Sequence, residues 1–214
     1  MNQQIKFKLI KPAKFSKMLV IFLKDLKPLA EVVNQVMRFH PESFESYDKH
    51  TLLLALEFMP EIIRKMKGNG LILALKFLPE LGVILRGGLP ALVLLAEFTG
   101  GDEQRIYDTM KKLQEEIRGK FDLKSRIAKN PADAQKYWII RRESFNLLRK
   151  HVQGKKSAPF IDDIIVLPAK LPEFLPRLEN VLANYRGLVY TIAGHAGDGN
   201  FHIIPLMDMS DLAN

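Results

Sequence analysis

Apolar residues in the first half of the chain form continuous runs and helix-spaced stripes in turn. The run KMLVIFLKD at 17–25 predicts a buried strand, and residues 26–42 carry apolar positions three to four apart, which predicts a helix. ALVLLAEFTG at 91–100 predicts a second strand, which ends in a Gly-Gly pair. Residues 101–120 then predict a helix that begins at the N-cap residue Asp102. Its apolar stripe consists of Ile106, Met110, Leu113 and Ile117.

The second half of the chain continues the alternation of helices and strands. The periodicity predicts helices over 131–153 and 171–185, and strands over 160–168, 187–194 and 203–209. Strand–helix units of this kind predict an α+β fold, here a ferredoxin-like domain with an antiparallel sheet and helices packed mainly on one face. We therefore expect the whole chain to form one domain of this class.

A short internal repeat separates the two halves. LLLALEFMPE at 52–61 returns as LILALKFLPE at 71–80, with seven of ten positions identical. Neither run reaches the roughly 20 apolar residues that span a bilayer. Two short amphipathic helices therefore pack on the core or lie on a membrane surface, and residues 52–86 are the candidate region for peripheral membrane contact. Two copies are too few for a solenoid.

Composition narrows the setting and the partners. The 214 residues are 47% hydrophobic, which is enough for a substantial core. The absence of cysteine excludes disulfides, thiolate zinc sites and iron–sulfur ligation within the chain, and favours a cytoplasmic location. The net charge is +8, but the basic residues are dispersed and no nucleic-acid-binding motif accompanies them. We therefore expect an anionic small molecule, another domain or an acidic lipid surface as partner, and no nucleic acid.

Two histidines lie close to an Asp-Gly turn in GHAGDGNFH at 194–202. Asp-Gly favours a two-residue type I′ hairpin, which predicts that His195 lies directly opposite His202 on one sheet face. Such a pair either binds a metal ion, binds an anionic substrate or the edge of a cofactor, or is exposed on the surface without a function. Two ligands alone do not complete a metal site. The surplus glycines of the stretch predict close approach of a ligand to the backbone.

The helix at 131–153 places cations next to an aromatic stripe. Trp138, Arg141 and Arg142 fall at helical spacing, so at least one guanidinium lies between the core and solvent. A planar guanidinium there suits a carboxylate, although an arginine on a helix flank is often merely solvated or ion-paired.

These motifs together resemble a known family. GHAGDGNFHIIPLMD is similar to the GHxGDGNxH signature of the C-terminal domain of FAD-linked oxidases, a group that includes D-lactate dehydrogenases, the glycolate oxidase flavoprotein subunit and D-2-hydroxyglutarate dehydrogenase. The Trp138-x-x-Arg141 element, IDDIIVLP and VLLAEFTG extend the resemblance over roughly residues 15–214.

The resemblance implies roles for individual residues. His195 and His202 would ligate a divalent metal, Zn or Mn, while Arg141, or its neighbour Arg142, would bind a substrate carboxylate. Gly197 and Asn200 are the candidates for contact with the cofactor. The family's general base belongs to a segment that would follow residue 214, so we expect no complete catalytic set in this chain.

The resemblance also implies a function and partners. The chain would be the substrate-binding, or cap, part of a flavin-dependent dehydrogenase that oxidises a small D-2-hydroxy acid by hydride transfer to FAD. A flavin-binding domain or subunit would hold the FAD and would precede Met1. Ile204 and Pro205 depart from a 2-hydroxyglutarate-type pocket, which favours a D-lactate or glycolate type of substrate. The alternative is a non-enzymatic module that docks on a partner chain or on the inner membrane.

Overall fold

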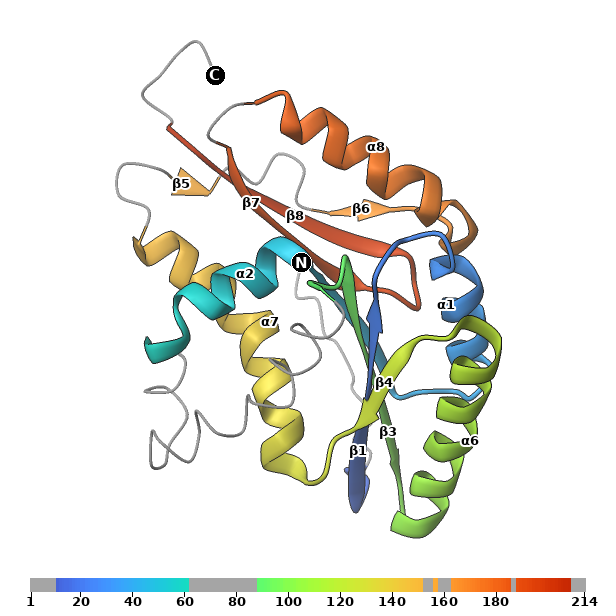
Figure 1. The fold of residues 1–214 in the computed structure, drawn as a ribbon. Coiled ribbons are helices and arrows are strands. Elements are labelled where there is room, and N and C mark those ends of the chain that lie inside the picture. Colours follow the sequence, from blue (N-terminus) through green and yellow to red (C-terminus); the bar gives the residue numbers. More distant parts are fainter. Residues whose placement is uncertain (1–10, 62–87, 152–155, 158–162, 186–187, 209–214) are drawn as a thin grey trace, which may run out of the picture.

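The computed structural model describes residues 11–61, 88–151, 156–157, 163–185 and 188–208. Within them, one antiparallel sheet with strands of different lengths has helices on both faces (Figure 1). The strands lie in the order β4-β1-β3-β2-β7-β8-β5, and β6 pairs separately with β8. Their bounds are β1 Phe15–Leu23, β2 Ser43–Asp48, β3 Leu92–Gly100, β4 Lys124–Ile127, β5 Lys156–Ser157, β6 Ile164–Ile165, β7 Val189–His195 and β8 Asn200–Met207.

The central strands are apolar on both faces because helices cover both. Alternate residues of β1 point to opposite sides. Leu19 and Ile21 join one hydrophobic cluster, whereas Met18 and Val20 join the other. A continuous apolar run such as MLVIFL is therefore what a strand covered on both sides requires.

Three helices share the first face of the sheet, and their apolar stripes explain it. These are α1 (Leu29–Met37), α6 (Glu103–Phe121) and α8 (Leu171–Ala183). All four stripe residues expected in α6 are buried, and Asp102 caps the helix by accepting hydrogen bonds from the backbone N–H groups of residues 104 and 105. The α6 prediction is thus confirmed in both its cap and its buried face.

The second face is covered by α2 (Lys49–Glu57) and α7 (Pro131–His151), which lie together on the other side of the sheet in Figure 1. Leu52 and Ala55 of α2 pack into the same cluster as Tyr137 and Ile140 of α7. The first half of the repeat therefore packs on the core. Its second half, at 71–80, lies outside the described residues.

The structure confirms the α+β class with an antiparallel sheet. Helices cover both faces of the sheet, however, and not mainly one as predicted, and the sheet has strands that the pattern did not predict. Neither β2 nor β4 was expected, and the strand expected at 160–168 is limited, among the described residues, to the short β6. In the described part of the chain, no helix combines the length and apolarity needed to cross a membrane.

Candidate functional site

The histidine hairpin forms, with a register that differs from the prediction. His195 pairs with Asn200, and His202 pairs with Ala193, so the turn contains four residues, 196–199. Of the Asp198-Gly199 pair, only Gly199 has a positive φ, at +67°. The two-residue type I′ turn was therefore wrong, and the directly opposed histidine pair with it.

The two imidazoles nevertheless lie side by side. A register shift of two residues keeps every side chain on its original face, because side chains alternate with a period of two. His195 and His202 thus become diagonal neighbours, with ring centroids 5.4 Å apart and ring planes at 88°. Both belong to the sheet face that α7 covers. Ala193, which is opposite His202 and two residues before His195, packs against the second hydrophobic cluster on that face.

A carboxylate from the neighbouring strand contacts the first histidine. Glu45 of β2 is directly opposite His195 of β7 in the sheet, and its Oε1 lies 2.8 Å from His195 Nδ1. The Glu45 side chain is only 10% exposed, whereas that of His195 is 45% exposed. The imidazole therefore has a buried edge fixed by Glu45 and an outer edge open to solvent or a ligand.

The same carboxylate binds the predicted arginine. Arg141, on α7 above this face, places Nη2 2.6 Å from Glu45 Oε2, and its side chain is 16% exposed. Its Nε is buried and has no hydrogen-bond partner among the described residues. A buried N–H donor without an acceptor is costly, so this atom marks a position where a ligand oxygen would be favourable.

Asn200 and Asp163 border the histidines on the other side. The Asn200 side-chain amide donates a short hydrogen bond to Asp163 Oδ1, and the same oxygen lies 3.8 Å from His202 Nδ1. Asn200 Oδ1 is buried and lacks a partner within the described residues. Three buried polar atoms of this face have no hydrogen-bond partner among the described residues: Arg141 Nε, Asn200 Oδ1 and Glu45 Oε2. Glu45 Oε2 nevertheless forms the ion pair with Arg141, so the donor on Arg141 and the acceptor on Asn200 are the two available to a ligand.

The glycines of the hairpin have explanations within the chain itself. A Cβ on Gly194 would lie 2.1 Å from the Asn200 carbonyl oxygen, and one on Gly199 would lie 1.9 Å from that of Val166. A Cβ on Gly197 would lie 2.9 Å from Met37 Sδ. Close packing of neighbouring parts of this chain thus accounts for the absence of a side chain at these three positions.

Two predictions remain to be compared with the structure: the role of Arg142 and the metal site. Arg142 is exposed and donates from Nε to the Trp138 carbonyl, so the structure brings Arg141 but not Arg142 to the Glu45 carboxylate. Among the described residues, no three histidine, aspartate, glutamate or cysteine side chains are grouped so as to hold a metal. The two histidines would therefore need at least one further ligand to complete a metal site.

Sequence reasoning missed Glu45, the residue that joins the others. Its segment, SFESYD, has no apolar run, and its partners are about 100 and 150 positions away in the chain. The available signal was alternation: Glu45 shares a face with Tyr47, a buried aromatic, and a charged residue on a buried strand face is rarely unpaired.

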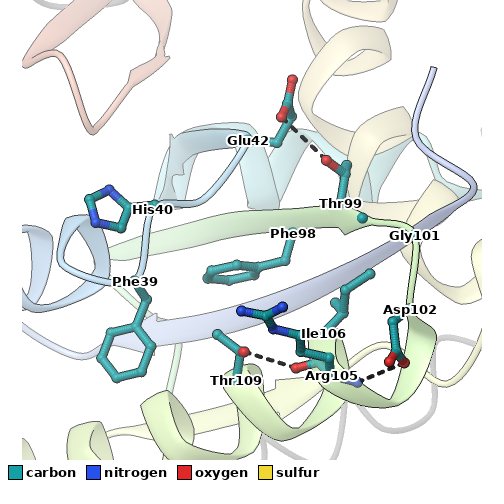
Figure 2. Close-up of a pocket in the computed structure, with 11 residues that line it drawn as sticks. Phe39, His40, Glu42, Phe98, Thr99, Gly101, Asp102, Arg105, Ile106 and Thr109 are labelled. Atoms are coloured by element: carbon teal, nitrogen blue, oxygen red, sulfur yellow. Dashed lines mark hydrogen bonds between the residues drawn. The ribbon is translucent and has the colours of Figure 1, made fainter. Parts of the chain in front are cut away.

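A separate cavity of about 480 Å³ lies on the opposite face, at the N-terminal end of α6 (Figure 2). Arg105 and Thr109 project from α6 on one side, while Glu42 accepts a hydrogen bond from Thr99 on the other. Phe98 at its base belongs to the first hydrophobic cluster. None of the residues predicted for the site lines this cavity.

The described residues thus form an α+β domain, and Arg141, Glu45 and His195 form a polar cluster on one helix-covered face of its sheet. A family model described as FAD linked oxidases, C-terminal domain, matches residues 13–214. The chain therefore belongs to this family, as the signature motif predicted, and membership implies FAD as the family's cofactor.

Curated relatives match over part of the chain. The chain is 26% identical over 123 residues to D-2-hydroxyglutarate dehydrogenase from Escherichia coli, and 25% identical over 121 residues to the enzyme of that name from Pseudomonas putida. Each match covers 55% of this chain and 12% of the relative. The chain is thus similar to a small part of these longer proteins, at an identity that leaves the substrate open.

Solved structures share the fold. Alkyldihydroxyacetonephosphate synthase matches with a TM-score of 0.62 and 11% identity, over 91% of this chain and 36% of that one. p-Cresol methylhydroxylase matches with a TM-score of 0.55 and 12% identity, over 93% of this chain and 40% of that one. These likenesses confirm the α+β class with an antiparallel sheet that the strand and helix pattern predicted.

Proposed function

We propose that this chain is the substrate-binding part of a flavin-dependent dehydrogenase that oxidises a D-2-hydroxy acid of the D-lactate or glycolate type. FAD, held mainly by a flavin-binding domain or subunit, would accept the hydride from the substrate carbon. The observation that carries the proposal is the buried guanidinium of Arg141, whose Nε has no partner among the described residues.

Arg141 is the residue that would bind the substrate carboxylate. A guanidinium has five N–H donors, so the contact from Nη2 to Glu45 leaves donors for a second anion. Its low exposure strengthens charge-assisted hydrogen bonds, because little water competes there. Asn200 Oδ1, an unpaired acceptor on the same face, would accept a hydrogen bond from the substrate or from the flavin edge.

His195 and His202 would face the substrate hydroxyl with their Nε2 atoms. Each ring has Nδ1 directed at a carboxylate, Glu45 for His195 and Asp163 for His202. This is the arrangement in which carboxylates orient imidazoles for metal binding. A divalent ion, Zn or Mn, would take these two ligands from the described residues and further ligands from elsewhere, and it would polarise the hydroxyl oxygen.

Binding of hydroxy acids to the 214-residue chain tests the assignment of Arg141. D-lactate, glycolate and D-2-hydroxyglutarate are titrated by calorimetry, with lactamide as a probe that lacks the carboxylate. In Arg141→Met, loss of a charge-assisted contact worth about 1.5–3 kcal/mol should weaken binding roughly 10- to 150-fold. Arg142→Met and Arg118→Met, at two exposed arginines, should bind as the unaltered chain does.

The same titrations separate the proposal from its alternative. If lactamide bound with the same affinity as D-lactate, or if Arg141→Met bound D-lactate as tightly as the unaltered chain, the carboxylate site would be refuted. If none of the hydroxy acids binds, the chain fits a non-enzymatic docking module instead. Metal binding is tested separately with the double variant His195→Ala/His202→Ala. This variant should no longer bind Zn or Mn, and unchanged metal binding would refute the assignment of the two histidines.

A further inference from the structure

We propose that Glu45 is a positioning residue that fixes both the tautomer of His195 and the orientation of the Arg141 guanidinium. The inference rests on the proposed function, in which these two residues meet the substrate. The observation that supports it is structural: the buried Glu45 carboxylate contacts each partner through a separate oxygen, Oε1 for His195 and Oε2 for Arg141.

The position of β2 in the sheet makes this bridging possible. β2 lies between β3 and β7, so Glu45 has strands on both sides and α7 above its face. The backbone register places Glu45 opposite His195, and the side chain of Arg141 reaches the same carboxylate from α7. Three segments distant in the chain thus meet at one carboxylate.

Burial makes Glu45 and Arg141 depend on each other. A buried charge is stable only when it is paired, and removing one member leaves the other uncompensated. Arg141 at 16% exposure therefore needs Glu45 in order to stay at this face, rather than turning towards solvent. The pair also holds the guanidinium plane, and with it the direction in which Nε points.

The contact with His195 sets the position of the ring proton. A carboxylate can only accept hydrogen bonds, so His195 must donate from Nδ1 across the 2.8 Å contact. In the neutral ring this leaves the lone pair on Nε2, at the open edge. Glu45 thereby presents Nε2 as an acceptor, which is the form that can ligate a metal or accept the proton of a hydroxyl.

Nitrogen-15 NMR of the 214-residue chain tests both halves without any substrate. At a pH where His195 is neutral, the unaltered chain should show its ring as the Nδ1–H tautomer. It should also show resolved Arg141 Nη protons, because the ion pair hinders rotation of the guanidinium. Glu45→Ala should lose both signatures, and its Kd for D-lactate should rise about tenfold.

Glu45→Gln separates the two halves and guards against a variant that does not fold. The glutamine carbonyl can still accept from Nδ1–H, so the tautomer should persist. Its amide lacks the charge that holds the guanidinium, so the resolved Arg141 Nη protons should disappear. Glu97→Gln is the matched control: Glu97 shares the face of Glu45 but hydrogen-bonds Ser16 and Ser43, so both signatures should remain.

The outcomes distinguish this inference from the proposed function. An Nε2–H tautomer in the unaltered chain, or resolved Arg141 Nη protons that survive in Glu45→Gln, would overturn the positioning role whatever the chain binds. Unchanged binding of D-lactate in Glu45→Ala would also overturn it, because Glu45 would then contribute nothing to the substrate site. Tighter binding would overturn it too, because Glu45 would then compete with the substrate for Arg141. Failure of the unaltered chain to bind any hydroxy acid refutes the proposed function alone.

Discussion

Asp133 in the first turn of α7 should be one of the most sensitive positions in the chain, because it neutralises a lysine that has no contact with solvent. Its Oδ1 lies 2.7 Å from Lys136 Nζ, and the Lys136 side chain is 0% exposed. Its Oδ2 lies 2.6 Å from Arg126 Nη2 and accepts the backbone N–H of Lys129 at 2.8 Å. The network fastens the start of α7, the helix that carries Arg141, to β4.

Asp133→Asn removes the charge while keeping the shape of the side chain. Breaking a buried ion pair from one side costs about 3–5 kcal/mol, because the buried Lys136 ammonium loses the carboxylate that contacts it. A domain of this kind has a free energy of unfolding of roughly 5–15 kcal/mol, so the loss would be a large fraction of the total. We therefore expect a marked fall in the urea midpoint, with the m-value unchanged.

Urea denaturation followed by circular dichroism measures the effect, and Glu173→Gln provides the control. Glu173 and Lys170 form a pair with the same three-residue spacing, but their side chains are 62% and 64% exposed, so losing that contact should cost less than about 1 kcal/mol. The double variant Asp133→Asn/Lys136→Met removes both charges and should recover part of the loss. A cost for Asp133→Asn as small as that of Glu173→Gln would refute the reasoning.

Two further predictions concern acid stability and the hairpin turn. The pKa of Asp133 is lowered: burial alone would raise it, but the hydrogen bond and charge of Lys136, the Lys129 N–H and the Arg126 charge outweigh that effect. Its stabilising contribution is therefore full above the ordinary value of 3.8 and is lost as the pH falls below it, so an acid titration should show a shallower decline for Asp133→Asn than for the unaltered chain. Gly199→Ala should lower the free energy of unfolding by about 1–3 kcal/mol, because φ is +67° and a Cβ would meet the Val166 carbonyl oxygen at 1.9 Å. Gly101→Ala, where a Cβ meets nothing within 4 Å, should leave urea denaturation nearly unchanged, and equal effects of the two would contradict this account.

The parts of the fold that the sequence predicted are those specified by local patterns. The helix stripe and Asp102 cap of α6 lie within one segment, so a single window contains all the information needed. β2 and β4 are different, because SFESYD and KSRI are short and largely polar. β4 exists as a strand because it pairs along the edge of β1, which no local pattern reveals.

The hairpin illustrates which structural conclusions survive an error in register. The Asp-Gly signal gave the wrong turn length: the backbone pairs His195 with Asn200, and of the Asp-Gly pair only Gly199 has a positive φ. The resulting shift is two residues, so the face assignments of His195 and His202 were unaffected. A shift of one residue would have placed a histidine in the first hydrophobic cluster, beside Phe201.

Glu45 marks the limit of prediction from local pattern, and the reason is energetic. A carboxylate on a buried strand face is tolerated only with a partner, so its presence beside Tyr47 requires cations from elsewhere in the fold. Which cations these are depends on the pairing of β2 with β7 and on the packing of α7, both of which join residues far apart in the chain. The cluster therefore forms only when these three elements are in place, and any change that loosens α7 should release Arg141 from Glu45, while the contact between Glu45 and His195 joins β2 and β7.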